Sequence, residues 1–311
     1  MSSTKHTIEE LKAGAANYGC TYHIQQIRSI DYESLLIAMF FERMQRKSND
    51  ILNIFNSIAG KDWNETFYIM LLRVLGGMDN RQAMTELSRR VNSSVVMREN
   101  ISVINLEALL IGASGLLELY PDDSYIKRLR LEFDHLAAKY NITPMLPGEW
   151  NLSVCYRNNH PTLRIAQLAA CLHNKKFTVH NALQCTNSRD VYDLFDGKAS
   201  EYWVENYIPI VHTITVNERI GQLKSDLLGI NLIAPMIYTY GNYILDEDMA
   251  YSSLTLLENI AAEHNRFTKP WYKSGVEPRN AFVSQALIQL SKEYCTPRRC
   301  EECMLAKMVT K

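Results

Sequence analysis

The sequence predicts an all-α protein of about twelve helices, because apolar residues recur at intervals of three and four along most of the chain. No proline occurs before Pro121, so nothing in the first third of the chain interrupts a succession of helices. Apolar residues make up 47% of the chain and charged residues 22%, the balance of a folded globular protein. We therefore expect the whole chain to fold around a helical core.

Three apolar stripes at helical spacing predict three helices joined by short turns in the first third of the chain. The stripes consist of Leu35, Leu36, Met39, Phe40 and Met44, of Ile51, Ile54, Phe55 and Ile58, and of Trp63, Phe67, Met70, Leu71, Val74 and Leu75. Glycines at Gly60 and at Gly76-Gly77 stand where helices are expected to end.

Two further amphipathic helices follow, with a fully apolar segment between them. Asn80 is suited to cap the first, and either Asp122 or Asp123 the second. Residues 103–119 are apolar on every side, which predicts one buried helix at the core of the N-terminal half.

The stretch 141–161 interrupts the helical pattern with three prolines and a glycine. We place a boundary there, giving a lead segment 1–30, an N-terminal helical subdomain 31–143 and a C-terminal helical subdomain 144–311. One continuous domain is the alternative.

Beyond this stretch, helical spacing resumes in six segments, 162–172, 190–195, 201–207, 218–228, 246–263 and 280–294. Residues 208–216 alternate in part, a pattern compatible with a short strand pair.

The net charge, the first ten residues and one uncharged internal stretch limit the cellular location and the binding partners that we expect. The chain has 33 basic and 34 acidic side chains, so any nucleic-acid site must be a local patch. Residues 1–10 are polar and lack the apolar core of a secretory signal, which predicts a cytoplasmic protein. Residues 227–245 carry no charge but include Asn231 and Pro235, so we expect a buried or broken helix there and no membrane partner.

The cysteines carry the most definite chemistry in the sequence. In the cytoplasm the seven cysteines are expected to stay reduced or to bind metal. Cys295, Cys300 and Cys303 form a C-x4-C-x2-C pattern, which suits a zinc ion or an iron–sulfur cluster. The alternative is that these three thiols are reduced and pack as small apolar groups.

A metal site would need a fourth ligand. The sequence leaves this ligand open among Cys20, Cys155, Cys171, Cys185, a histidine and an external molecule.

Three other groups of polar residues are candidates for ligand binding. Glu107 lies in the most apolar segment and should have a raised pKa or a basic partner. Arg164 and Gln167 share a helix face and, with Asn159 and His160 just before that helix, suit an anion or a base edge. A structural network of helix-capping and interdomain hydrogen bonds is the alternative. Glu263 and Asn265 precede Trp271 and Tyr272 and would frame a pocket for a base or sugar; the alternative is a helix end followed by a loop.

Several separated motifs resemble one known family. They are Glu107-Ala108-Leu109-Leu110, Arg164-Ile165-Ala166-Gln167-Leu168-Ala169, Tyr202-Trp203, Ile230-Asn231 with Pro235 and Tyr240-Gly241, and Ser284-Gln285-Ala286-Leu287-Ile288-Gln289-Leu290 with Tyr294-Cys295. Together they resemble an uncharacterised bacterial family, domain of unknown function 2851, from about Ile30 to Met304.

The resemblance implies that this chain is the C-terminal helical part of that family and lacks its usual N-terminal nuclease-like region. It implies no activity. The chain also departs from the family before Pro161, where Tyr156-Arg157 replaces an Arg-Pro pair.

The cysteine spacing also resembles, in part, the iron–sulfur loop of helix-hairpin-helix DNA glycosylases, C-x6-C-x2-C-x5-C. The first interval is shorter here and the last cysteine is absent. The likeness implies a loop that presents Arg298 and Arg299 to phosphates, and it implies no glycosylase activity.

These observations favour a binding protein over an enzyme. The sequence has no phosphate-binding glycine loop, dinucleotide fingerprint, H-E-x-x-H helix or nucleophile elbow. The leading hypothesis is a helical binding module for nucleic acid with a cysteine-bound metal. The alternative is a protein-interaction scaffold whose cysteines are reduced and structural, and an enzyme with a site around Glu107, Arg164 or Glu263 is a weaker third.

Overall fold

The computed structural model describes residues 7–14, 20, 24, 27–153, 159–212 and 216–310. Helices account for most of these residues, and a single two-stranded antiparallel sheet is found among them, which confirms the all-α prediction. The chain divides into two compact units, a terminal unit of residues 1–50 and 237–311 and a central unit of residues 51–236. The boundary predicted at residue 144 lies inside the central unit.

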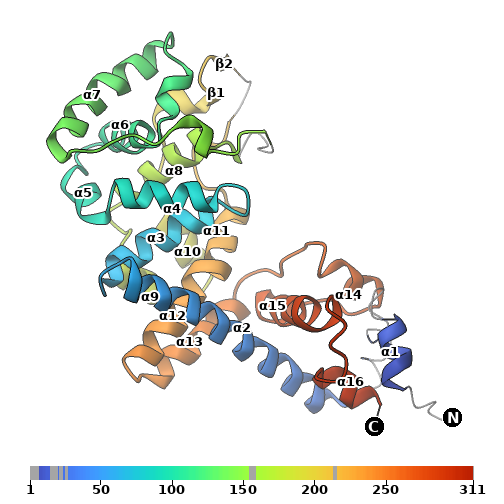
Figure 1. Ribbon diagram of the computed structural model, residues 1–311. Helices are drawn as coiled ribbons and strands as arrows, with labels where there is room; N and C mark the ends of the chain where they lie inside the picture. The colour runs from blue at the N-terminus through green and yellow to red at the C-terminus, as the bar shows by residue number, and fades with distance from the viewer. Residues whose placement is uncertain are drawn as a thin grey trace. The chain divides into compact units, whose positions relative to one another are not determined.

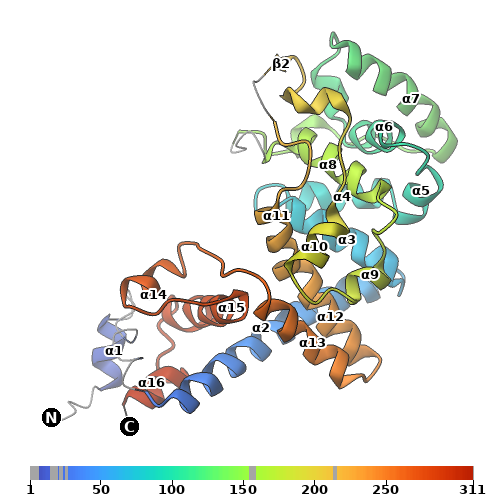
Figure 2. The same ribbon diagram turned by 180° about the vertical axis from the view of Figure 1, so that it is seen from behind.

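The central unit is a set of short helices (Figures 1 and 2). They are α3 (Trp63–Leu75), α4 (Arg81–Arg90), α5 (Ser93–Arg98), α6 (Val103–Ala113), η3 (Leu116–Leu119), α7 (Ser124–Tyr140), η4 (Pro147–Glu149), α8 (Pro161–His173), α9 (Val179–Leu183), α10 (Ser188–Phe195), η6 (Glu201–Val204), α11 (Gln222–Leu228) and the π-helical turn η7 (Gly229–Ile233). The sheet consists of β1 (Asn206–Ile208) and β2 (Val211–His212), within which Ile208 pairs with Val211.

The core of the central unit forms around α6, which packs against both α7 and α8. Its residues from Asn105 to Ala113 are all buried, as the apolar sequence predicts. The helix ends at Ala113, however, and does not continue to Leu119. Gly115 adopts a φ of 74°, and a Cβ there would lie 2.0 Å from the carbonyl oxygen of Met145, so the chain must turn at this glycine.

Helix caps explain where several of these helices begin. Asp62 caps α3 by accepting from the backbone N–H of Asn64, and Asp123 caps α7 through Ile126, which confirms the second assignment. Asn80 precedes α4 as expected, but its side chain pairs with the backbone of Asn151 and does not cap the helix.

The sheet lies where the sequence alternates. It overlaps the predicted segment 208–216, of which residues 213–215 lie outside the described part of the chain. The helix predicted over 201–207 is wrong beyond Val204, because the chain passes there from the turn η6 into β1.

The terminal unit combines segments from both ends of the chain. Its elements are α1 (Ile8–Gly14), α2 (Ser29–Ser57) as far as Asp50, α12 (Ala234–Tyr243) from Ile237, α13 (Glu247–Glu258), α14 (Lys269–Lys273), α15 (Ala281–Leu290), the π-helical turn η8 (Ser291–Cys295) and α16 (Met304–Val309). The rings of Phe40 in α2 and Phe282 in α15 meet edge to face, 5.6 Å between centroids, and so pack the two helices together.

The first two predicted helices form one continuous helix, α2. The prediction of a turn between Met44 and Ile51 is wrong, because that stretch is polar but contains neither glycine nor proline. The apolar stretch 227–245 is divided among α11, η7 and α12. Within the described residues, no helix combines the length and apolar character needed to cross a membrane.

Candidate metal loop and buried cationic sites

The cysteine loop, residues 295–303, lies between η8 and α16. Arg298 N donates to Cys295 O and Cys303 N donates to Cys300 O, both at 3.2 Å. The second bond closes a tight turn, the backbone arrangement by which a C-x2-C pair can hold one ion. Cys300 and Cys303 are buried, and Cys295 is half-buried.

Cys20 is a fourth thiol beside this loop. It is buried, and its charge interacts with those of Cys295, Cys300 and Cys303. Burial raises the pKa of Cys20 to about 12, and the thiols of Cys303 and Cys300 raise it as well. Burial also raises the pKa of each of the three loop thiols. The four thiols therefore interact through their charges and are neutral at pH 7.

One exposed ion pair links the N-terminal segment to the cysteine loop. Lys12 in α1 forms an ion pair with Glu301, the residue after Cys300. Two other cysteines that the sequence left open as ligands have partners elsewhere: Cys171 Sγ donates to a carbonyl oxygen of the central unit at 3.0 Å, and Cys185 Sγ to another at 3.4 Å. Cys155 and the Tyr156-Arg157 pair lie outside the described residues.

Four neighbouring thiols have the donor chemistry of a soft-metal site. Thiolates are the ligands that select zinc or an iron–sulfur cluster, and burial keeps competing water away. In the described part of the chain, no three cysteine, histidine, aspartate or glutamate side chains already converge on a position that would hold a metal ion. The thiols thus interact through their charges without forming a coordination shell.

Arg298 and Arg299, which the sequence places between these cysteines, differ in their surroundings. Arg299 Nε donates to Glu302 at 3.2 Å, and its guanidinium lies 5.4 Å from the centre of the Tyr294 ring. The Arg298 side chain is exposed and makes no hydrogen bond or ion pair with the described residues; its φ is 58°. Of the two, Arg298 is free for an external anion, whereas Arg299 is already paired.

Glu263 and Asn265 belong to one hydrogen-bond network. The carboxylate of Glu263 accepts from Asn265 Nδ2 at 2.8 Å and from Gln285 Nε2 at 2.7 Å. Its backbone N–H donates to Ser284 Oγ at 3.0 Å. Trp271 is fully buried and donates its indole N–H to a serine hydroxyl. Trp271 is therefore a core residue and not the wall of an open pocket, which corrects that part of the prediction.

Arg43, in α2 of the same unit, was not singled out from the sequence. Its exposed fraction is 5%, and its side chain makes no hydrogen bond or ion pair with the described residues. Burial lowers its pKa to about 10, and the charge of Arg46 lowers it further. A signal was present: Arg43 follows Met39 by four residues and Phe40 by three, which places a guanidinium on the apolar face of the helix.

Asn159, Arg164 and Gln167 are brought together, as their spacing predicts. The Arg164 guanidinium donates to Gln167 Oε1 and to Asn159 Oδ1, both at 2.7 Å. Gln167 in turn donates to the carbonyl oxygen of Asn217 at 2.6 Å. The side chains thus form a hydrogen-bond network in the central unit, and both acceptors of the guanidinium are uncharged amides.

Lys224, in α11, adds a second cation beside this network. Burial lowers the pKa of Lys224 to about 8 and that of Arg164 to about 10, and the charge of Arg164 also lowers the pKa of Lys224. Neither cation forms an ion pair with a carboxylate among the described residues. Asn159 is exposed, so the group reaches the surface of the unit.

Glu107 is fully buried in α6 and is satisfied by neutral donors. Its carboxylate accepts from Ser200 N at 2.9 Å, from Trp203 Nε1 at 3.1 Å and from the Tyr125 hydroxyl. Burial raises its pKa, as predicted, while these hydrogen bonds oppose the shift. Glu107 and Arg164 have no hydrogen-bond partner in common among the described residues.

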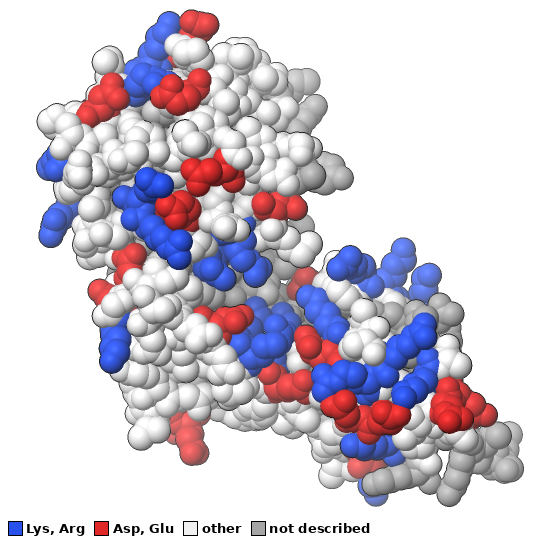
Figure 3. Space-filling view, viewed as in Figure 1, with Lys and Arg blue, Asp and Glu red and all other residues white. Residues whose placement is uncertain are grey.

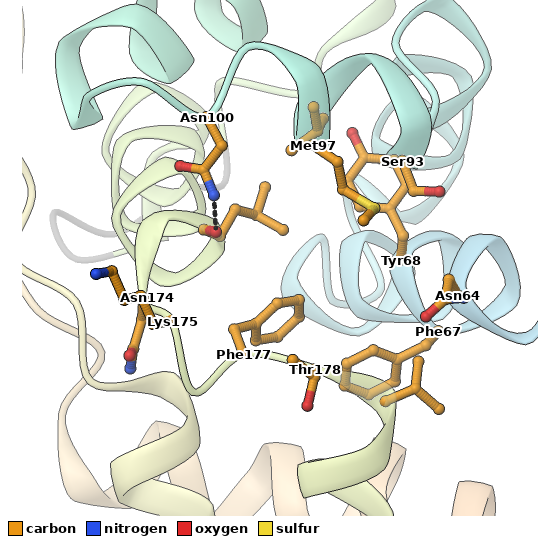
Figure 4. Close-up of a pocket in the computed structure, with 13 residues that line it drawn as sticks. Asn64, Phe67, Tyr68, Ser93, Met97, Asn100, Asn174, Lys175, Phe177 and Thr178 are labelled. Carbon is orange, nitrogen blue, oxygen red and sulfur yellow. Dashed lines mark hydrogen bonds between the residues drawn. The ribbon is translucent and has the colours of Figure 1, made fainter.

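The central unit also contains a pocket of about 270 Å³, lined by residues of α3, α5 and the segment that follows α8 (Figure 4). Phe67 and Phe177 line it and stack, with 5.2 Å between ring centroids. Asn100 donates to the carbonyl oxygen of Leu172 at 3.0 Å. None of the site residues proposed from the sequence lines this pocket.

Comparison with known proteins identifies the family and no activity. The model of a family described as protein of unknown function (DUF2851) matches residues 1–266, a range that includes Cys20, Arg43, Glu107 and Arg164. The cysteine loop lies beyond the matched residues. No curated protein and no solved structure matches the chain. Because the match extends over most of its 311 residues, the chain belongs to the DUF2851 family.

Proposed function

We propose that this protein is a helical binding module for nucleic acid whose cysteine loop holds a zinc ion or an iron–sulfur cluster. The proposal rests most heavily on the buried thiols of Cys300 and Cys303, the half-buried thiol of Cys295 and their mutual interaction. Two cations without a carboxylate partner among the described residues, the buried Arg164 and the half-buried Lys224, support the nucleic-acid part.

Cys20 supplies the fourth ligand in this proposal. It is buried beside the loop, whereas Cys171 and Cys185 already have partners in the central unit. A metal would replace the thiol protons, so metal affinity falls as the pH is lowered. Bound in this way, the metal joins the N-terminal segment to the C-terminal loop and stabilises the terminal unit.

The nucleic-acid part depends on the balance of charge around Arg164. Its guanidinium is oriented by Gln167 and Asn159, which are neutral, and Lys224 adds a second positive charge. Buried charges in proteins are ordinarily paired. A phosphate of the nucleic-acid backbone would supply the missing negative charge at Arg164. Arg298, exposed in the terminal unit, is a separate candidate for a phosphate contact.

A binding titration tests the nucleic-acid part. The full-length protein is titrated with single- and double-stranded DNA and RNA at several salt concentrations, beginning at low salt. We expect affinity to fall as salt rises, and Lys224→Met to reduce the slope of log affinity against log salt by about one.

Lys127→Met is the matched control, because it removes the same charge from an exposed position in α7. It should leave the affinity and the slope unchanged. Absence of any salt-dependent affinity for all four nucleic acids would refute the nucleic-acid part and leave a protein-interaction scaffold as the better account.

A further inference from the structure

Arg43 is the most buried cation of the terminal unit that has no partner. Its exposed fraction is 5%, and no described residue accepts a hydrogen bond from its guanidinium. Desolvating a guanidinium costs several kcal/mol in general, and an ion pair or hydrogen bonds normally offset this cost. No group in the described part of the chain does so for Arg43.

The carboxylates near Arg43 are engaged by other groups. Both oxygens of Glu263 accept from amides, those of Asn265 and Gln285. The Glu293 carboxylate lies 3.9 Å from the Nε of Arg46. The nearby acids therefore act on Arg43 only through space, and none forms an ion pair with it.

Arg43 belongs to a group of four cations whose charges interact in sequence. Its charge interacts with those of Arg46 and Lys292, and Lys292 interacts in turn with Arg266. Arg266 and Lys292 lie over the same ring, that of Phe267, at 4.7 Å and 4.8 Å from its centre. Against these four cations the same neighbourhood contains three carboxylates, Glu263, Glu293 and Glu42, the last joined to Arg46 through Gln289, which leaves an excess of one positive charge.

The surface position of these residues allows a ligand to approach. Arg46, Arg266 and Lys292 are exposed, in contrast to Arg43. Figure 3 shows lysine and arginine side chains gathered on the face of the terminal unit that carries α14 and α15. The arrangement is a buried guanidinium with solvent-accessible cations nearby, which suits a small anion.

We propose that Arg43, with Arg46, Lys292 and Arg266 at the rim, binds a single phosphate group. Phosphate matches the guanidinium in geometry, because its oxygens accept parallel hydrogen bonds from the guanidinium nitrogens. A phosphate dianion also carries the charge needed to offset the excess of cations. The group comes either from free inorganic phosphate or from the end of a phosphorylated chain, and the experiment below distinguishes the two.

This site is independent of the proposed metal and of Arg164, so either proposal can fail alone. The first experiment is a calorimetric titration of the full-length protein with inorganic phosphate at constant ionic strength. We expect saturable binding at one site. Arg43→Met should weaken it by at least about tenfold, because the variant lacks the charge-assisted hydrogen bonds to the phosphate.

Arg28→Met is the matched control. Arg28 is an exposed arginine of the same unit whose guanidinium pairs with Asp31, so the variant loses the same charge away from the site. It should bind phosphate within about twofold of the wild type, as expected for an exposed pair. Equal loss in Arg28→Met and Arg43→Met, or no binding by the wild type, would overturn the proposal.

Thermal unfolding provides a second measurement, which can be made on the wild type even if a variant does not bind phosphate. Phosphate should raise the melting temperature of the wild type above that in sodium chloride of equal ionic strength. Without phosphate, Arg43→Met should be at least as stable as the wild type, since it removes an unpaired buried charge. If Arg43→Met does not fold, Lys292→Met should still reduce the phosphate-dependent shift. A wild-type melting temperature that does not respond to phosphate contradicts the proposal.

The source of the phosphate is settled by a pair of oligonucleotides that differ only in a 5′-phosphate. Tighter binding of the phosphorylated strand, lost in Arg43→Met, assigns the site to a nucleic-acid end. Binding of inorganic phosphate with no preference between the strands assigns it to a free phosphate compound. Both results support a phosphate site at Arg43, and they differ only in its ligand.

Discussion

Replacement of Glu107 by glutamine gives a prediction that follows from atomic contacts in the central unit. The carboxylate accepts three hydrogen bonds, one at Oε1 from Ser200 N and two at Oε2 from Trp203 and Tyr125. Glutamine offers one acceptor oxygen in place of two. Its lowest-energy orientation keeps the oxygen toward Trp203 and Tyr125 and turns the amide NH2 toward the Ser200 N–H.

That orientation leaves one buried donor without an acceptor. A lost partner of this kind costs about 1–3 kcal/mol, so Glu107→Gln should lower the free energy of unfolding by about that amount. Glu107→Ala removes the acceptor for all three donors and leaves a cavity in a fully buried site, and should cost at least about 3 kcal/mol.

The pH dependence of this effect has a definite sign. Burial raises the native pKa of Glu107 above the ordinary value of 4.5, so the native state holds this proton more tightly than the unfolded state. The stabilisation is fully present below the unfolded pKa and is lost as the pH rises through the native pKa. The stability of the wild type should therefore fall as the pH rises through the native pKa of Glu107, whereas Glu107→Gln should lack this component.

Chemical denaturation at several pH values measures these differences. Glu118→Gln is the control, because Glu118 is exposed and pairs with Arg130, and an exposed pair contributes at most about 1 kcal/mol. The reasoning is refuted if Glu107→Gln is no less stable than Glu118→Gln at neutral pH.

Two further substitutions test other parts of the central unit. Gly112→Ala would place a Cβ 2.1 Å from the Phe133 ring, so we expect a loss of about 1–3 kcal/mol in thermal unfolding, and an unchanged melting temperature would contradict the packing of α6 on α7. Burial lowers the pKa of His160 from 6.5 to about 4. As the pH falls, the unfolded state therefore binds a proton at His160 before the native state does. The free energy of unfolding of the wild type should fall by up to about 3 kcal/mol as the pH drops from 6.5 toward 4. His160→Gln should lack this component.

Local sequence predicted the helices well where one strong signal dominated. The apolar run after Val103 predicted the buried α6, and Asp123 predicted the start of α7. The errors arose where a second signal competed. Gly115 ends α6 although the sequence stays apolar, and the polar stretch after Met44 continues α2 because it contains no helix-breaking residue.

The candidate sites were predictable only where their residues are neighbours in sequence. Arg164 and Gln167 lie on one helix face, and their contact followed from spacing. Lys224 and Cys20 join their partners from distant segments, and nothing in the local sequence indicates either contact. Arg43 is intermediate, because its position on an apolar face was visible but the absence of a partner requires the folded chain.

The metal content of the protein tests the central claim most directly. Protein purified without oxygen should contain stoichiometric zinc, or iron with a broad visible absorption band. A Cys300→Ser, Cys303→Ser variant should lose the metal and Cys20→Ser should hold less, whereas Cys185→Ser should be unchanged because Cys185 lies in the central unit. A metal-free wild type, or metal retained in the double variant, would contradict the claim that these thiols form a metal site.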